Sequence, residues 1–151
     1  MSTRANIELY DGWEKHQGKS KWIVWKKGAV LYHHHDGYPS WMGPELERIL
    51  KTVKQELDQA GYSYWWDSER VAALMVKLSA DDSEFYKGVP RFQPCLNLHI
   101  DINYLWRVFL GPKDGAYDIQ CFSIVVGWDK DMIETLEPVD WRKEAKRQKG
   151  R

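Results

Sequence analysis

The apolar spacing between residues 46 and 57 constrains the fold of this chain more than any other feature. Aliphatic side chains recur there at intervals of three and four residues, at Leu46, Ile49, Leu50, Val53 and Leu57. This period predicts an amphipathic helix, and the residues between them are mostly charged or polar. Pro44 suits the first position of a helix, because its missing N–H needs no partner there. We therefore predict a helix from Pro44 up to Gly61.

A second helix is predicted shortly after the first. Asp67 or Ser68 can cap its N-terminus, because either side chain can accept a hydrogen bond from a free backbone N–H of the first turn. The apolar residues that follow at helical spacing are Val71, Leu74, Met75 and Leu78. They predict one buried face for this helix.

Strand patterns lie on both sides of the two helices. Residues 5–10 alternate weakly and predict a short strand, and a polar loop is expected from Asp11 to Lys21. Residues 22–25 and 29–32 then read as a hairpin that turns at residues 26–28. A long strand is predicted from Cys95 to Leu110, with a turn at residues 111–115 and a return strand from Tyr117 to Val126.

The period of two along the long strand separates its side chains into two faces. Asn97, His99 and Asp101 fall on the face opposite the apolar residues. The prediction for the whole chain is one α+β domain over residues 1–140, followed by a basic C-terminal tail over residues 141–151. We expect an antiparallel sheet of about five strands with two helices packed on one face.

Aromatic content is high, with nine tryptophans and eight tyrosines in 151 residues. A core built from large rings accounts for much of this content, because each ring buries a large apolar area. The alternative is that some rings line a pocket and stack on a nucleobase or another flat ligand. Trp65 and Trp66 lie between the two predicted helices, where they either close over a site or fill the core.

Formal charge is balanced, with 22 basic and 22 acidic residues. This balance argues against an acidic mimic of nucleic acid and against a strongly basic DNA-binding protein. The basic tail is expected to be a solvated helix end, and contact with RNA or DNA is the alternative.

Cys95 and Cys121 form neither a metal-binding motif nor a disulfide framework, as in a reducing cytosol. No apolar run is long enough for a membrane span, so we expect a cytoplasmic protein.

The turn between residues 32 and 44 is the first candidate site, because strand-to-helix turns often carry binding groups. It contains His33, His34, His35 and Asp36, with Tyr38 and Trp41 close by. Alternate residues His33 and His35 could join His99 and Asp101 as metal ligands. Consecutive histidines point in different directions, however, so we expect no metal site, and the residues identify no cofactor.

The pair His99 and Asp101 is the second candidate, because a carboxylate beside an imidazole can support general acid–base chemistry. The alternatives are a hydrogen-bonded outer face and a recognition role toward a ligand. For catalysis the candidates are His34, Asp36, His99 and Asp101. For ligand binding they are His33, His34, His35, Asp36, Tyr38, Trp41, Trp65, Trp66, Asn97, His99 and Asp101.

Residues 1–7 read Met-Ser-Thr-Arg-Ala-Asn-Ile, and residues 31–39 read Leu-Tyr-His-His-His-Asp-Gly-Tyr-Pro. In these two segments the chain resembles a group of small bacteriophage and prophage proteins. Those proteins begin Met-Ser-Thr-Arg-(Ser/Ala)-Asn-Ile and carry a Tyr-Arg-His-x-Asp-Gly-Tyr-Pro turn before a helix. Residues 1–7 match the first pattern, and His34, Asp36, Gly37, Tyr38 and Pro39 match the second. His33 stands where those proteins carry Arg. The resemblance covers roughly the first third of the chain and implies a phage context without assigning a reaction.

Three hypotheses for function follow. The first is a phage accessory protein that binds a host molecule without catalysis and acts against host defence, by sequestering a nucleotide signal or blocking a host protein. The second is a small hydrolase of a nucleotide-like substrate that uses the histidine and aspartate candidates, with or without a divalent metal. The third is an interaction module whose basic tail binds nucleic acid, for which binding would depend steeply on salt.

Overall fold

A computed structural model describes residues 3–81, 87–99, 101–125 and 135–149 of the chain. Its described residues form six strands and three helices. In chain order these are β1 (Ala5–Gln17), β2 (Ser20–His33), α1 (Pro39–Gln59), α2 (Ser68–Asp81), β3 (Phe92–Cys95), β4 (Tyr104–Leu110), β5 (Tyr117–Val125), β6 (Thr135–Val139) and α3 (Trp141–Lys149). The predicted α+β class is confirmed.

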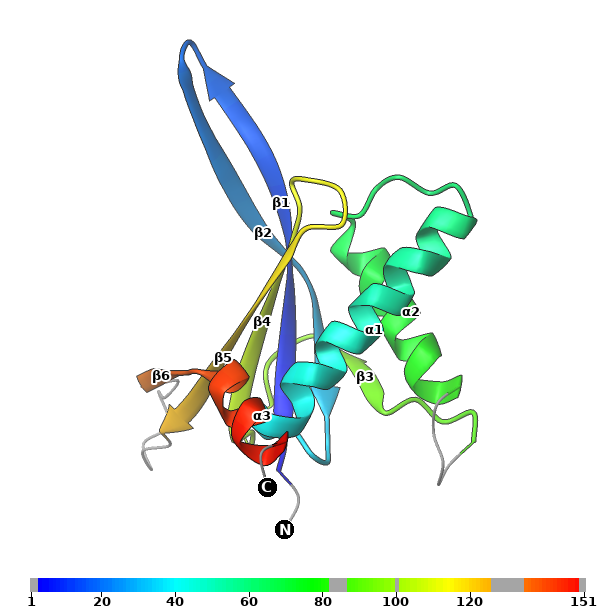
Figure 1. The fold of residues 1–151 in the computed structure, drawn as a ribbon, viewed down its shortest axis with the longest axis vertical. Helices are drawn as coiled ribbons and strands as arrows, with labels where there is room; N and C mark the ends of the chain where they lie inside the picture. The colour runs from blue at the N-terminus through cyan, green and yellow to red at the C-terminus, as the bar shows by residue number, and fades with distance from the viewer. Residues whose placement is uncertain (1–2, 82–86, 100, 126–134, 150–151) are drawn as a thin grey trace.

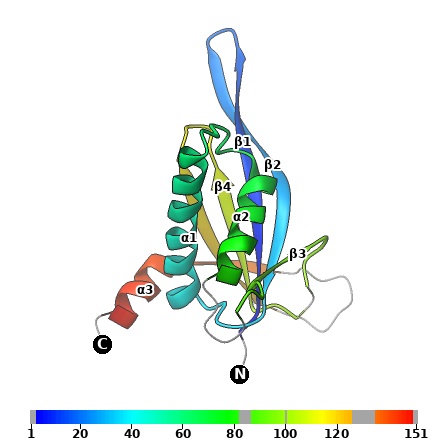
Figure 2. The same ribbon diagram turned by 90° about the vertical axis from the view of Figure 1, so that its right-hand side faces the viewer.

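The strands form one mixed sheet in the order β3-β2-β1-β4-β5-β6. Described neighbours pair antiparallel except β1 and β4, which run parallel from the pair Ala5–Tyr104 to the pair Asp11–Leu110. This parallel pair joins the three strands β3-β2-β1 to the three strands β4-β5-β6. Helices α1 and α2 cover one face, as Figures 1 and 2 show. We call the opposite face the open face.

Both predicted helices are present, and their apolar stripes form the core. The predicted stripe of α1 is buried along its whole length, and Val71 and Met75 of α2 are buried beside it. Asp67 caps α2, because its Oδ1 accepts a hydrogen bond from the backbone N–H of Arg70 at 3.2 Å. The predicted start of α1 was wrong. The helix begins at Pro39, so Pro44 lies inside it.

The first hairpin differs from the prediction. The turn lies at Gly18 and Lys19 rather than at residues 26–28, and the predicted loop from Asp11 to Lys21 consists largely of paired strand. Gly28 is an unpaired bulge residue inside β2, since Leu9 pairs with Ala29 and Tyr10 pairs with Lys27. A side chain at Gly28 would meet Ser68 Oγ at 2.0 Å. The glycine therefore allows a close approach to α2 and does not turn the chain.

The predicted long strand from Cys95 to Leu110 is also wrong. β3 ends with Cys95 beside Val30, whereas β4 begins with Tyr104 beside Ala5, which in turn pairs with His33. The intervening chain must therefore cross β2 and β1 before β4 can start. Asn97, His99 and Asp101 lie on this crossing segment and not on a strand. Ile100 and Val126, which the prediction placed in strands, lie outside the described residues.

The predicted basic tail forms α3 over residues 141–149. Trp141 at its start is buried, and its Nε1 donates a hydrogen bond to the carbonyl oxygen of Ile119 at 2.9 Å. Its ring lies against Gly43 of α1 and 6.1 Å from the ring centroid of Trp106. The basic residues Arg142, Lys143, Lys146 and Arg147 are exposed. One end of the tail thus belongs to the core.

Beyond the last pair between β1 and β4, the hairpin continues as a free-standing arm. We define the arm as residues 12–26, which pair with each other and, at Lys26, with Asp11. Figure 1 shows it projecting from the end of the sheet opposite to α3. An isolated two-stranded ribbon is only marginally stable in water. Contacts at its base must therefore hold the arm.

Candidate functional site

The histidine turn does not gather its side chains at one place. His33 is 3% exposed and faces the helices, where its ring packs against Phe92 and Trp41 at centroid distances of 5.0 and 5.6 Å. Burial, aided by the nearby charge of Arg91, lowers its pKa to about 4 against the opposing effect of the His35 backbone. A neutral, packed imidazole accounts for this residue structurally.

Tyr32 joins two of the predicted residues on the open face. Its ring stacks on His99 with centroids 3.8 Å apart and an interplanar angle of 6°. Its hydroxyl hydrogen bonds with Nδ1 of His34 at 3.0 Å. Asn6 holds the crossing segment in place, because its Oδ1 accepts the backbone N–H of His99 at 2.7 Å. The structure therefore places His34 and His99 each in contact with Tyr32, and His99 reaches it from a loop and not from a strand face.

The other predicted residues of this region lie around that pair. Asp101 forms an ion pair with Arg4 at 3.0 Å, and His35 meets the ring of His34 edge to face at 4.4 Å. Asp36 has a positive φ of 55°, and Asn97 is exposed. Tyr38 is the N-cap residue of α1, and Trp41 lies on the helix side with His33. His33 and His99 therefore lie on opposite faces of the sheet. The possible metal ligands His33, His35, His99 and Asp101 thus do not come together.

A buried carboxylate on the open face was missed by the sequence analysis. Glu8 is 3% exposed and lies in the middle of the sheet. Its oxygens accept hydrogen bonds from Arg107 at 2.9 Å, from Tyr10 at 3.1 Å and from Lys27 at 3.2 Å. A charge this deep must be paired to be tolerated. The three donors tie β1 to β2 and β4, which is a structural role.

The two tryptophans between the helices differ in environment. Trp65 is buried, and its Nε1 donates a hydrogen bond to the carbonyl oxygen of Ala116 at 2.7 Å, so it fills the core. Trp66 is exposed and meets the arm residue Trp13 edge to face at 5.9 Å. Of the two predictions for this pair, Trp65 fits the core and Trp66 remains at the surface.

The arm carries the largest group of exposed apolar side chains among the described residues. Trp22 is 44% exposed and Ile23 is 45% exposed, and Trp13, Val24 and Trp25 are each 38% exposed. Residues paired across an antiparallel ribbon share a face. The pairs Trp13–Val24 and Lys15–Trp22 therefore lie on one face. Lys26, two residues from Val24, lies there too. We call Trp13, Lys15, Trp22, Val24 and Lys26 the tryptophan face.

The tryptophan face lies on the same side as α2, since Trp13 meets Trp66 and Asp11 accepts the backbone N–H of Ser68 at 2.9 Å. Trp25 lies on the other side of the ribbon, where it packs edge to face against Phe109 at 5.1 Å. A side chain at Gly12 would meet the Trp25 ring at 2.4 Å. Trp25 therefore anchors the base of the arm. Trp22 makes no ring contact within the described part of the chain.

A hollow of about 830 Å³ lies where the tryptophan face joins the body. It is lined by Gly12, Trp13, Glu14, Trp66, Pro112 and Lys113. Its volume lies in the range of small-molecule sites, and it combines two indole rings with one ammonium group. The sequence signal for this region was the alternation of Trp13 and Lys15 on one side of Gly18, and of Trp22, Val24 and Lys26 on the other.

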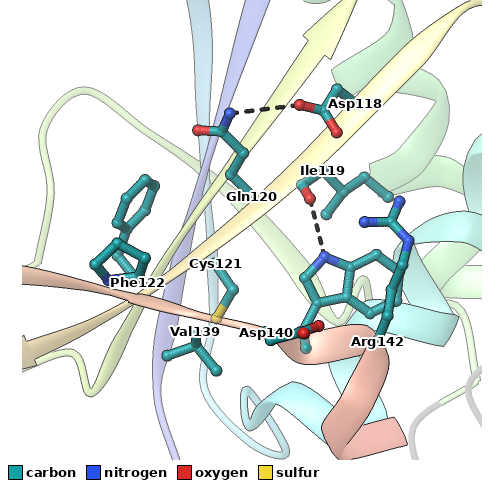
Figure 3. Close-up of a pocket in the computed structure, with 10 residues that line it drawn as sticks. Asp118, Ile119, Gln120, Cys121, Phe122, Val139, Asp140 and Arg142 are labelled. Atoms are coloured by element: carbon teal, nitrogen blue, oxygen red, sulfur yellow. Dashed lines mark hydrogen bonds between the residues drawn. The ribbon is translucent and has the colours of Figure 1, made fainter. Parts of the chain in front are cut away.

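A second hollow, of about 370 Å³, lies between β5, β6 and the start of α3 (Figure 3). Its polar groups already serve the fold. Trp141 is bonded to Ile119, and Asp140 Oδ1 accepts the backbone N–H of Lys143 at 3.2 Å. Burial raises the pKa of the Cys121 thiol to about 12, which makes it a poor nucleophile. We therefore assign this hollow to the packing of α3.

Within the described residues, no three His, Cys, Asp or Glu side chains form a group able to hold a metal ion. None of the described helices combines the length and apolar character that a bilayer crossing requires. Comparison of the chain with models of protein families, with curated proteins and with solved structures gives no match.

Proposed function

We propose that this chain is a phage-encoded accessory protein that acts in the host cytoplasm by binding a host molecule without changing it chemically. The resemblance of residues 1–7 and 31–39 to phage and prophage proteins supports the phage context. The proposal includes a role against host defence, in which the bound molecule is a nucleotide signal or another host component. The tryptophan face of the arm is the proposed contact surface.

The exposure of the arm is the observation that carries this proposal. Trp13, Trp22 and Val24 face solvent on a ribbon that has no further strand partner among the described residues. Fully burying a large apolar side chain contributes about 1.5–3 kcal/mol, and a partner that covers these three gains the share that corresponds to their exposed 38–44%. Exposed apolar patches bordered by polar groups commonly mark interaction sites. The hollow at the base adds two indole walls, with Lys113 and Glu14 as its charged groups, and the indoles suit a flat ligand.

The test compares the wild-type chain with Trp22→Ala after purification from bacterial cells without added ligand. Native mass spectrometry, with analysis of co-purifying protein and nucleic acid, identifies what each form carries. We expect a molecule bound to the wild type and depleted from Trp22→Ala, and we expect it unchanged in mass after prolonged incubation. Retention of the same molecule by Trp22→Ala, or its conversion during incubation, would contradict the proposal. Val89→Ala is the control, because Val89 is an exposed apolar side chain off the arm.

A hydrolase acting on a nucleotide-like substrate is the second candidate, and the contacts of both His34 and His99 with Tyr32 favour it. Here the imidazoles would exchange protons with the substrate, with Asp36 and Asp101 as the acidic candidates. His34→Ala and His99→Ala should then each abolish turnover while the circular dichroism spectrum stays that of the wild type. Turnover at the wild-type rate in both variants would remove this candidate. The same two histidines stay candidate ligand contacts in the binding role.

A further inference from the structure

We infer that the tryptophan face binds single-stranded nucleic acid, with bases stacked on its indole rings and phosphates contacted by its lysines. This inference rests on the proposed binding role of the arm and names the class of its partner. It differs from the tail hypothesis, since it places nucleic acid on residues 13–26 and not on residues 141–151.

Charge on the arm is strongly one-sided although the whole chain is neutral. Residues 12–26 contain four lysines and one acidic residue, Glu14. Glu14 is already paired with Lys21 at 2.9 Å. Lys15, Lys19 and Lys26 make no ion pair with any described residue. A local excess of unpaired ammonium groups attracts a polyanion and gains further affinity by releasing counterions.

The order of side chains on the tryptophan face places aromatic rings next to lysines. Trp13 and Lys15 alternate along β1, and Lys26, Val24 and Trp22 follow each other along β2 on the same face. Rings and cations are therefore interleaved. Proteins that bind single strands combine stacking rings with a basic track in this way, because every base offers a flat face and every link carries a charge.

The base of the arm extends the same surface onto the body. Trp66 stands 5.9 Å from Trp13, and Lys113 lines the hollow beside both rings. A strand lying along the arm can thus continue into the hollow, where a third indole and a further cation are available. A protein partner would also bury the rings, but its binding would gain less from three unpaired lysines. The charge therefore favours nucleic acid over protein.

The test uses fluorescence anisotropy of the full chain with a labelled oligothymidylate of about 20 nucleotides, longer than the site of a typical single-strand-binding domain. The matching duplex and thymidine monophosphate serve as the other probes. We expect the single strand to bind more tightly than either, and its affinity to fall as salt rises. Trp22→Ala should weaken binding about tenfold, the scale of one lost stacking contact. Lys15→Gln with Lys26→Gln should reduce the salt slope by about 1.4, or about 0.7 for each phosphate contact.

Lys143→Gln with Lys146→Gln in α3 is the matched charge control. It removes the same charge from the exposed tail and should leave both affinity and salt slope unchanged. The inference is overturned if the single strand does not bind, if the duplex or the monophosphate binds as tightly, or if only the tail variant weakens binding. It is likewise overturned if the chain self-associates through the arm, seen as a sedimentation mass that falls in Trp22→Ala.

The same variants separate this inference from the proposed function. If Trp22→Ala loses a molecule carried from cells but no oligonucleotide binds the wild type, then the arm is a contact surface for another partner. In that case the inference fails and the proposed function stands. If Trp22→Ala retains everything that the wild type carries, the proposed function fails.

Discussion

Trp13 and Trp66 meet edge to face with their ring centroids 5.9 Å apart, and this contact joins the projecting arm to the loop between α1 and α2. The two residues are far apart in the chain, and both rings stay exposed. Together with the contact of Trp25 with Phe109, this pair ties the arm to the body. The two rings also form two walls of the hollow at the base.

We expect the pair to couple energetically. Edge-to-face aromatic pairs contribute about 0.5–1.5 kcal/mol beyond the area that they bury. In a double-mutant cycle of Trp13→Ala and Trp66→Ala, the free energy of unfolding of the double variant should exceed the additive expectation by that amount. Urea unfolding of the wild type, the two single variants and the double variant measures this coupling free energy. Trp22→Ala combined with Trp66→Ala is the control pair and should be additive, because no ring contact links these two among the described residues. Additive behaviour of Trp13 and Trp66 would contradict the contact.

Gly43 and Trp141 provide a test of how α3 docks on α1. A Cβ at Gly43 would lie 2.1 Å from the Trp141 ring. Gly43→Ala should therefore lower the free energy of unfolding by about 1–3 kcal/mol through overpacking. In the Trp141→Ala background the clash is gone, so Gly43→Ala should be neutral or stabilise by up to about 1 kcal/mol, the helix preference of alanine. Denaturant midpoints of Gly43→Ala in the wild-type and Trp141→Ala backgrounds measure the two effects. A penalty of equal size in both backgrounds would show that the ring does not lie against Gly43.

His33 makes stability depend on pH. Burial, aided by Arg91, lowers the folded-state pKa from 6.5 to about 4, so the folded protein favours the neutral ring. The contribution of the neutral His33 ring to the free energy of unfolding is complete above the unfolded pKa of 6.5. It is lost as the pH falls from 6.5 toward 4. The full loss is on the order of 3 kcal/mol. His33→Phe should remove this part of the decline between pH 6.5 and 4, measured by urea unfolding across that range. His16→Gln changes an exposed histidine and should leave the decline unchanged.

The two cysteines should differ in their reaction with thiol reagents. Cys121 is buried in β5, where burial raises its pKa to about 12. Cys95 lies half-buried on β3, with three strands between it and β5, and burial raises its pKa as well. We expect Cys95 to react first with an aromatic disulfide reagent in native buffer, and Cys121 to react at the rate of unfolding. Cys95→Ala should abolish the early phase. An early phase that persists in Cys95→Ala would contradict the burial of Cys121.

Local patterns were most reliable where neighbouring residues decide the outcome. The stripe from Leu46 to Leu57 and the cap at Asp67 both predicted helices that are present, because an amphipathic stripe and a capping side chain act within one element. The start of α1 was missed because Pro39 and Pro44 are both acceptable near a helix start. The packing of the surrounding chain, and not the presence of a proline, decides that the helix begins at Pro39.

Strand boundaries and pairings could not be obtained in the same way. The segment from Cys95 to Leu110 alternates like one strand, yet β3 and β4 lie on opposite sides of β2 and β1. Whether an alternating segment is one strand or two is decided by which partners offer free N–H and C=O groups. Those partners, Val30 of β2 and Ala5 of β1, are about 65 and 100 residues distant along the chain.

Sequence by itself determined the α+β class, the two long helices and the candidate residues His34 and His99. Each of these follows from the periodicity or chemistry of a short segment. Only the tertiary structure decided that His33 is buried away from His99, that Trp65 fills the core while Trp66 stays outside, and that residues 12–26 project as an arm. The physical reason is that exposure depends on what packs against a side chain. The strand pairs that leave the arm without a further partner join segments far apart in sequence.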